Sequence, residues 1–91
     1  MTHHDWARKQ IGFYTNSVNF DIEQMKHHRE IIKKEIAFIK EAQKEGYTFT
    51  TTKEKEDAER WYRHYYNQKK HDEKMIAKYY KELAGLEVIL Y

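Results

Sequence analysis

Six histidines and several helix-spaced carboxylates are the residues of this chain that could hold a metal ion. On a helix, Glu23 and His27 lie one turn apart on one face, and His71 is expected opposite His27. Imidazole and carboxylate ligands suit zinc, iron or manganese. Di-metal helical bundles, however, place Glu and His three residues apart, and no acidic residue precedes a histidine at that spacing here. We therefore expect solvated histidines and no cofactor.

The segment from Arg60 to Tyr66, RWYRHYY, combines basic and aromatic side chains within two helical turns. Aromatic rings stack on bases and arginine binds phosphate, so one interpretation is a nucleic-acid-binding stripe. This stripe would consist of Arg60, Arg63, Lys69, Lys70 and Tyr66. The same residue types dominate protein–protein hot spots, and we favour that interpretation. The expected surface for a protein partner or for self-association comprises Trp61, Tyr62, Arg63, Tyr66 and Tyr80.

The charges of the chain are nearly balanced, with 17 Lys and Arg against 15 Asp and Glu and a net charge of +2. This balance weakens the case for purely electrostatic binding of nucleic acid. The sequence has no glycine-rich phosphate loop, and its one serine, Ser17, has no histidine and carboxylate beside it. Glu56 and Asp57 fit the first turn of a helix, where acids stabilise the helix dipole. We expect no enzymatic activity.

Three charged residues, Arg29, Lys69 and Asp72, interrupt the apolar spacing of the predicted helices. Arg29 and Asp72 could form a buried ion pair, with Lys69 nearby. Such a pair penalises slipped pairings of two helices more than it adds stability. We expect this polar layer to fix the helix register rather than to bind a ligand.

Apolar residues at intervals of three and four predict two long amphipathic helices, over about 3–45 and 51–90. The seam of the first helix comprises Ile11, Tyr14, Val18, Ile22, Met25, Ile32, Ile36 and Ile39. Its step from Val18 to Ile22 contains an extra residue, which would locally relax a supercoil. The seam of the second helix comprises Ala58, Tyr62, Tyr65, Ile76, Tyr79, Leu83, Leu86 and Leu90. Poor helix formers between residues 12 and 19 leave open a break in the first helix, although its seam continues across them.

A short turn at residues 46–50 joins the two helices, with Gly46 suited to the position just past a helix end. Two helices with so short a link should fold back as an antiparallel hairpin, which places residue i opposite roughly residue 97 − i. In this register Tyr14 meets Leu83 and Ile32 meets Tyr65. The predicted fold class is therefore all-α, a coiled-coil-like helical hairpin that spans residues 1–91 as one domain.

Aromatic residues beside the seam, Phe13, Phe20 and Phe38 among them, exceed what one buried stripe can cover. A second hairpin would cover them in a four-helix bundle, so we expect a homodimer. We interpret the chain as a non-enzymatic regulatory adaptor or inhibitor that binds a protein partner; a phage or mobile element would be one source of such a protein. The sequence has no cysteine, no membrane span and no apolar signal-peptide stretch at its N-terminus, so the cytoplasm is the expected compartment.

Overall fold

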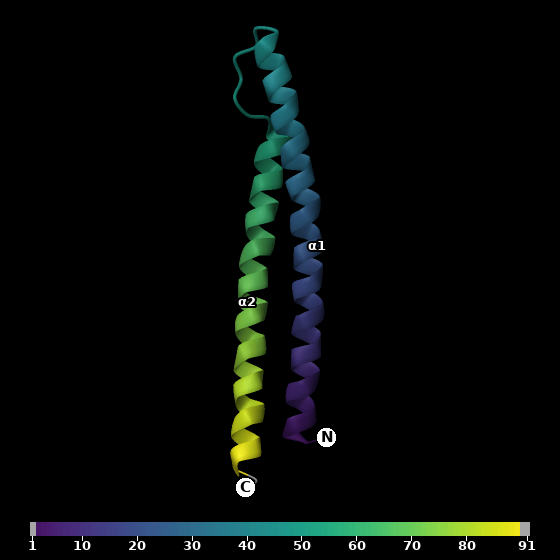
Figure 1. Ribbon diagram of the computed structural model, residues 1–91, viewed down its shortest axis with the longest axis vertical. Helices are drawn as coiled ribbons and strands as arrows, with labels where there is room; N and C mark the ends of the chain where they lie inside the picture. The colour runs from purple at the N-terminus through teal and green to yellow at the C-terminus, as the bar shows by residue number, and fades with distance from the viewer. Residues whose placement is uncertain (1, 90–91) are drawn as a thin grey trace. The chain divides into compact units, whose positions relative to one another are not determined.

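Two long helices and one connecting loop make up the described part of the chain, residues 2–89 of the computed structural model. α1 (His3–Lys44) and α2 (Lys53–Ile89) run antiparallel, as Figure 1 shows. The predicted all-α class and helical hairpin are confirmed. The expected end of the second helix at residue 90 lies outside the described residues, as do the side chains of Leu86 and Leu90.

Contacts divide the chain into two units, each of which is an antiparallel pair of helical segments. Unit 1 comprises the described residues up to Asp21 and those from Asn67 onward, and unit 2 runs from Ile22 to Tyr66 and includes the loop. The core of unit 1 is built on Ala7, Tyr79 and Leu83, with Ile11, Tyr14 and Met75 packed against it. The buried hydrophobic residues of unit 2 are Ile39, Ala42 and Ala58.

α1 begins with a side-chain cap and continues without a break. The Thr2 hydroxyl accepts a hydrogen bond from the backbone N–H of Asp5 at 3.1 Å, which satisfies one of the free donors at the helix start. Residues 12–19 are helical, and the Thr15 hydroxyl donates to the carbonyl of Ile11 at 2.7 Å. The weak helix formers of this stretch are therefore accommodated within the helix.

The C-terminus of α1 is closed by a Schellman motif around Gly46. The backbone N–H of Tyr47 donates to the carbonyl of Ala42, and that of Gly46 donates to the carbonyl of Gln43, both at 3.1 Å. Gly46 has a φ of 98°, in the left-handed region that a residue with a Cβ adopts only at a cost. This motif turns the chain away from the helix axis.

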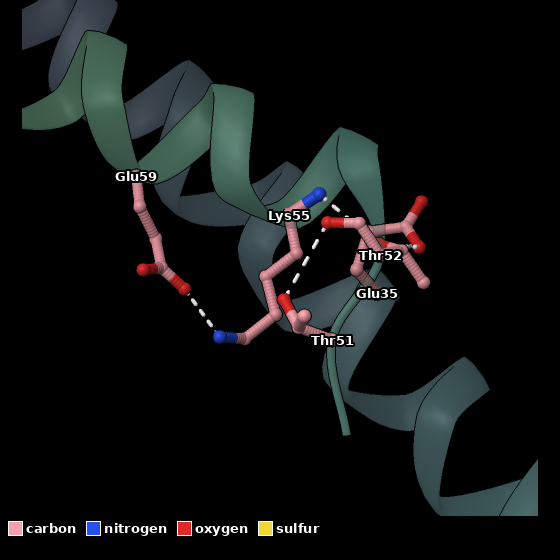
Figure 2. A network of polar contacts seen from close by, with 5 residues as sticks. All are labelled: Glu35, Thr51, Thr52, Lys55 and Glu59. Atoms are coloured by element: carbon pink, nitrogen blue, oxygen red, sulfur yellow. Dashed lines mark hydrogen bonds and ion pairs between the residues drawn. The ribbon is translucent and has the colours of Figure 1, made fainter. Parts of the chain in front are cut away.

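The loop at residues 45–52 then returns along α1 before α2 begins (Figure 1). The ring of Phe49 stacks on that of Phe38, with centroids 6.0 Å apart. The Thr52 hydroxyl donates to the Glu35 carboxylate at 3.0 Å and accepts from the N–H of Lys55 at 3.1 Å, so it both anchors the loop and caps α2 (Figure 2). Thr52, rather than the neighbouring Thr51, is the cap of the second helix. The Lys55 ammonium pairs with Glu59 one turn further on.

The helix register differs from the predicted one by about one turn. In unit 1 the Tyr14 ring stacks on Tyr79, 6.2 Å between centroids, rather than meeting Leu83. In unit 2 the Tyr65 ring stacks on His28 at 5.9 Å rather than meeting Ile32. The reason is the returning loop, because a tight turn would start α2 nearer to the end of α1.

The seam of α1 is regular, with no extra-residue step. A series of buried and half-buried positions runs along it in steps of four and three: Ala7, Ile11, Tyr14, Val18, Asp21, Met25, His28, Ile32, Glu35, Ile39 and Ala42. Some residues beside this series, Ile22 among them, are half-buried as well. Asp21 therefore occupies the seam position that the sequence assigned to its neighbour Ile22, and Glu35 the one assigned to Ile36, whose side chain is 37% exposed. The predicted seam contained an extra-residue step because it used the more apolar residues, Ile22 and Ile36, at these two positions.

Replacing Gly46 by alanine should destabilise the chain by about 1 kcal/mol, because the left-handed backbone then strains a Cβ. Gly12→Ala is the matched control: Gly12 is helical, no atom within 4 Å meets an added Cβ, and alanine should stabilise α1 by about 0.5–1 kcal/mol. Urea unfolding followed by circular dichroism measures both free energies. Equal effects of the two substitutions would contradict the Schellman assignment.

Candidate functional site: a buried carboxylate pair and exposed aromatic rings

Two aspartates lie buried against each other in the seam of unit 1. Asp21 of α1 is 3% exposed and Asp72 of α2 is 4% exposed, and they are the buried polar residues of the described chain. Both positions follow from the heptad spacing, since Asp21 lies seven residues after Tyr14 and Asp72 seven before Tyr79. The Tyr14–Tyr79 stack forms the neighbouring layer of the same seam.

The hydrogen bonds of this pair are incomplete unless one carboxyl carries a proton. The Ser17 hydroxyl donates to Oδ2 of Asp72 at 2.7 Å. Oδ2 of Asp21 is buried and receives no hydrogen bond from the described residues. A protonated Asp21 could donate to Asp72, and this bond would satisfy both side chains.

Burial, then the hydrogen bond to Asp72 and the charge of Asp72, together raise the pKa of the Asp21 carboxyl to about 6. The segment of α1 from Gln10 to Phe20 contributes no charged residue to this environment. From α2, Lys69 lies one turn before Asp72, and its ammonium binds Glu73 at 2.9 Å. The His71 ring lies against Tyr14, 6.4 Å between centroids. The arrangement can hold a proton between two helices, and its burial leaves no access for a substrate.

The structure gives Arg29 and Asp72 different partners from those expected. The Arg29 guanidinium donates to the Tyr62 hydroxyl at 3.1 Å and lies 5.8 Å from the centre of that ring. Asp72 has Ser17 and Asp21 as its partners. The predicted polar layer included Asp72, but it did not include Ser17 or Asp21. The available signal was the spacing of Asp21 from Tyr14, together with the uncharged run that precedes Asp21.

The histidines of unit 2 belong to an aromatic cluster. The His28 ring stacks on Trp61 and Tyr65, at 6.3 and 5.9 Å between centroids, and His27 meets it edge-on at 5.0 Å. Burial, and then the neighbouring His27, lowers the pKa of His28. These contacts favour the neutral ring, which packs better among aromatic side chains.

The residues weighed for a metal site are not gathered into one. Glu23 pairs with Lys26 at 3.8 Å, and the His71 ring contacts Tyr14. Among the side chains that the structure describes, residues 2–85, no three His, Asp or Glu residues converge closely enough to hold a metal ion.

The expected interaction residues differ in how far they reach solvent. Trp61, Arg63, Tyr66 and Tyr80 are exposed, whereas Tyr62 is half-buried and accepts the hydrogen bond from Arg29. Among the alternative nucleic-acid residues, Arg60 contacts Asp57 at 3.9 Å and Lys69 binds Glu73, while Lys70 is exposed. The cations of this set thus alternate with acids along α2.

The predicted interaction set left out two of the most exposed rings in the structure. Phe13 is 64% and Phe20 55% exposed. They lie seven residues apart, and Trp6 precedes Phe13 by another seven, so the three rings project from one side of α1 within unit 1. The Trp6 ring turns back onto Tyr79, at 5.3 Å between centroids. Phe13 and Phe20 therefore form an outward aromatic pair.

Comparison with known protein families, with curated proteins and with solved structures gives no match to this chain. No helix within residues 2–89 has the length and apolar character needed to cross a membrane. The function proposed for the chain therefore rests on its own residues.

Asp21→Asn should abolish a pH dependence of stability that the wild-type chain shows. Because the folded pKa of Asp21 lies above the unfolded value of 3.8, the folded state binds the extra proton between these values. The contribution of Asp21 to stability is present below pH 4 and is lost as the pH rises through about 6. Relative to Asp21→Asn, the wild type should lose about 2.5 kcal/mol of unfolding free energy between pH 4 and pH 7.5.

Urea unfolding of both chains across this pH range measures the difference. Asp57→Asn is the control, because it removes a more accessible carboxylate of α2 whose nearest cation, Arg60, is 3.9 Å away. A constant difference between wild type and Asp21→Asn over the whole range would show that Asp21 titrates normally.

Proposed function

We propose that this chain is a non-enzymatic interaction module that self-associates through its exposed aromatic rings, two helical hairpins forming a four-helix bundle. The observation that carries the proposal is the accessible surface of the single chain, 7076 Å². A compact folded monomer of 11.3 kDa exposes about 5,700 Å². The chain thus presents about 1,300 Å² more surface than a protein of this mass normally leaves in water.

The small core of the chain supports the same proposal. The buried hydrophobic residues among those described are Ala7, Ile39, Ala42, Ala58, Tyr79 and Leu83, three of which are alanines. Large apolar side chains are exposed at nine positions in the same part of the chain: Trp6, Phe13, Phe20, Ile36, Phe38, Tyr47, Trp61, Tyr66 and Tyr80. Burying such rings against another helix pair would supply the hydrophobic stabilisation that a single hairpin lacks.

A second copy is the occupant that the areas and charges favour. Stable interfaces bury about 800 Å² on each partner, which the excess surface of this chain can provide. The net charge of +2 is small for 91 residues, so two copies repel each other weakly. Phe13 and Phe20 are the first candidates for the interface, because both rings are more than half exposed and no charged residue lies between them.

A regulatory adaptor or inhibitor would use the aromatic surface that self-association leaves free. In unit 2 a groove of about 300 Å³ is lined by Ile32, Tyr62 and Tyr66, with Glu59 and Arg63 at its edge. Tyrosine and arginine beside an aliphatic residue are typical of protein hot spots, and the two opposite charges would orient a helix of a protein partner.

The Phe13→Lys/Phe20→Lys variant should raise the dissociation constant of the dimer at least tenfold, because lysines at both positions remove the aromatic contact and add like charges. Light scattering behind size exclusion, over a dilution series, measures the mass against 11.3 kDa for one chain. The matched control is Thr15→Lys/Asn19→Lys, which adds the same charge at exposed positions on another side of the same segment. It should leave the dimer intact.

A wild-type mass of one chain at all concentrations would contradict self-association and leave the aromatic rings to a different protein. A dimer that both variants retain would place the interface away from Phe13 and Phe20. Circular dichroism verifies that the variants keep the helix content of the wild type.

A further inference from the structure

We propose that Asp21 and Asp72 form a proton-dependent clasp: one proton shared between their carboxyls holds the two helical segments of unit 1 together, and its loss lets this unit open. The two carboxyls come from different helices, so any repulsion between them acts to separate α1 from α2. They also occupy the centre of the seam rather than its surface, since both are almost fully buried. Water therefore screens the repulsion poorly.

The chemistry of the clasp is one acid dissociation. In the closed form the Asp21 carboxyl keeps its proton and donates it in a hydrogen bond to Asp72, while the Ser17 hydroxyl donates to Oδ2 of Asp72. On opening, water enters, the Asp21 O–H bond breaks, and the proton leaves to solvent while its electron pair stays on the carboxylate. Two solvated carboxylates replace the hydrogen-bonded pair, and the unpartnered Oδ2 of Asp21 gains water.

The charged groups around Asp21 and Asp72 affect whether a rise in pH weakens or strengthens the contact between the two carboxyls. On α1, the residues from Gln10 to Phe20 include no charged side chain. After Asp21, α1 carries Glu23, which pairs with Lys26 at 3.8 Å. On α2, the charged or titratable residues within three positions of Asp72 are Lys69, Lys70, His71, Glu73 and Lys74. Lys69 binds Glu73 at 2.9 Å, and the His71 ring lies against Tyr14. Raising the pH therefore weakens the clasp, and lowering it closes the clasp.

Unit 1 is also a segment that could open by itself. Its buried hydrophobic core consists of Ala7, Tyr79 and Leu83. Unit 2 has no buried acid among its described residues, and its loop is tied to α1 by the bonds of Thr52 and Gln43. Opening of unit 1 would expose Tyr14, Tyr79 and Leu83, a surface of the kind that pairs with another helix. The clasp would thus make this surface available at neutral pH and cover it in acid.

Native-state hydrogen exchange of the full chain, at pH 5 and pH 7.5 and at several low urea concentrations, tests this proposal. After correction for intrinsic rates, the opening constant of unit 1 amides should rise by about tenfold between these pH values. This opening should depend weakly on urea, because it exposes only part of the chain. Amides of unit 2 should exchange through openings with a steeper urea dependence. In Asp21→Asn the rise should vanish, and in Asp57→Asn it should persist.

A direct titration of the side chains keeps the test decisive even if Asp21→Asn fails to fold. The carboxyl ¹³C shift of wild-type Asp21 should show a midpoint above pH 5. The clasp is overturned if Asp21 titrates near pH 4. It is also overturned if unit 1 amides exchange only by openings as urea-dependent as those of unit 2, or if Asp21→Asn keeps the pH-dependent rise.

Discussion

The seven-residue spacing of the seam is the constraint on which the other features of this protein depend. It fixes which side chains of α1 and α2 face each other, whatever their polarity. Each heptad of α1 contributes two seam positions. The first is occupied by apolar residues, in the order Ile11, Val18, Met25, Ile32 and Ile39, and the second by Tyr14, Asp21, His28 and Glu35. The polar residues at the second position are held in the seam because the apolar residues at the first position bind the helices together. A buried acid pair is a consequence of this alternation.

The same spacing explains why so many aromatic rings remain outside. A two-helix seam covers one stripe on each helix, and rings on its flanks, such as those of Phe13 and Phe20, stay more than half exposed. In unit 1 the seam itself is weakened by two buried carboxyl groups, while its flank carries the exposed rings of Phe13 and Phe20. A weak seam beside an apolar flank favours association with further helices over a stable isolated hairpin. The proposed dimer and the proposed clasp are both consequences of this imbalance, but neither requires the other.

The sequence was sufficient to predict the helices and their antiparallel pairing, because apolar periodicity over many turns is a strong signal. It was insufficient for the register. That depended on the loop, where Thr52 reaches back to Glu35 and Phe49 to Phe38, and such contacts have no periodic signal. It was also insufficient at Asp21 and Glu35, because each stands beside an isoleucine that a hydrophobicity criterion prefers. Polar seam positions are recognised by spacing alone, and a one-residue shift in the assumed seam hides them. Asp72 was identified because no apolar neighbour competed with it.

The helix register is the claim that all the site assignments share, and interproton contacts between labelled rings test it most directly. In protein with labelled tyrosine and leucine side chains at pH 5, nuclear Overhauser effects should connect the Tyr14 ring with the Tyr79 ring. That result would place Asp21 opposite Asp72. Strong effects between Tyr14 and Leu83 with none between Tyr14 and Tyr79 would shift α2 by one turn. Asp21 would then lie against Ile76, and the carboxylate pair would not exist.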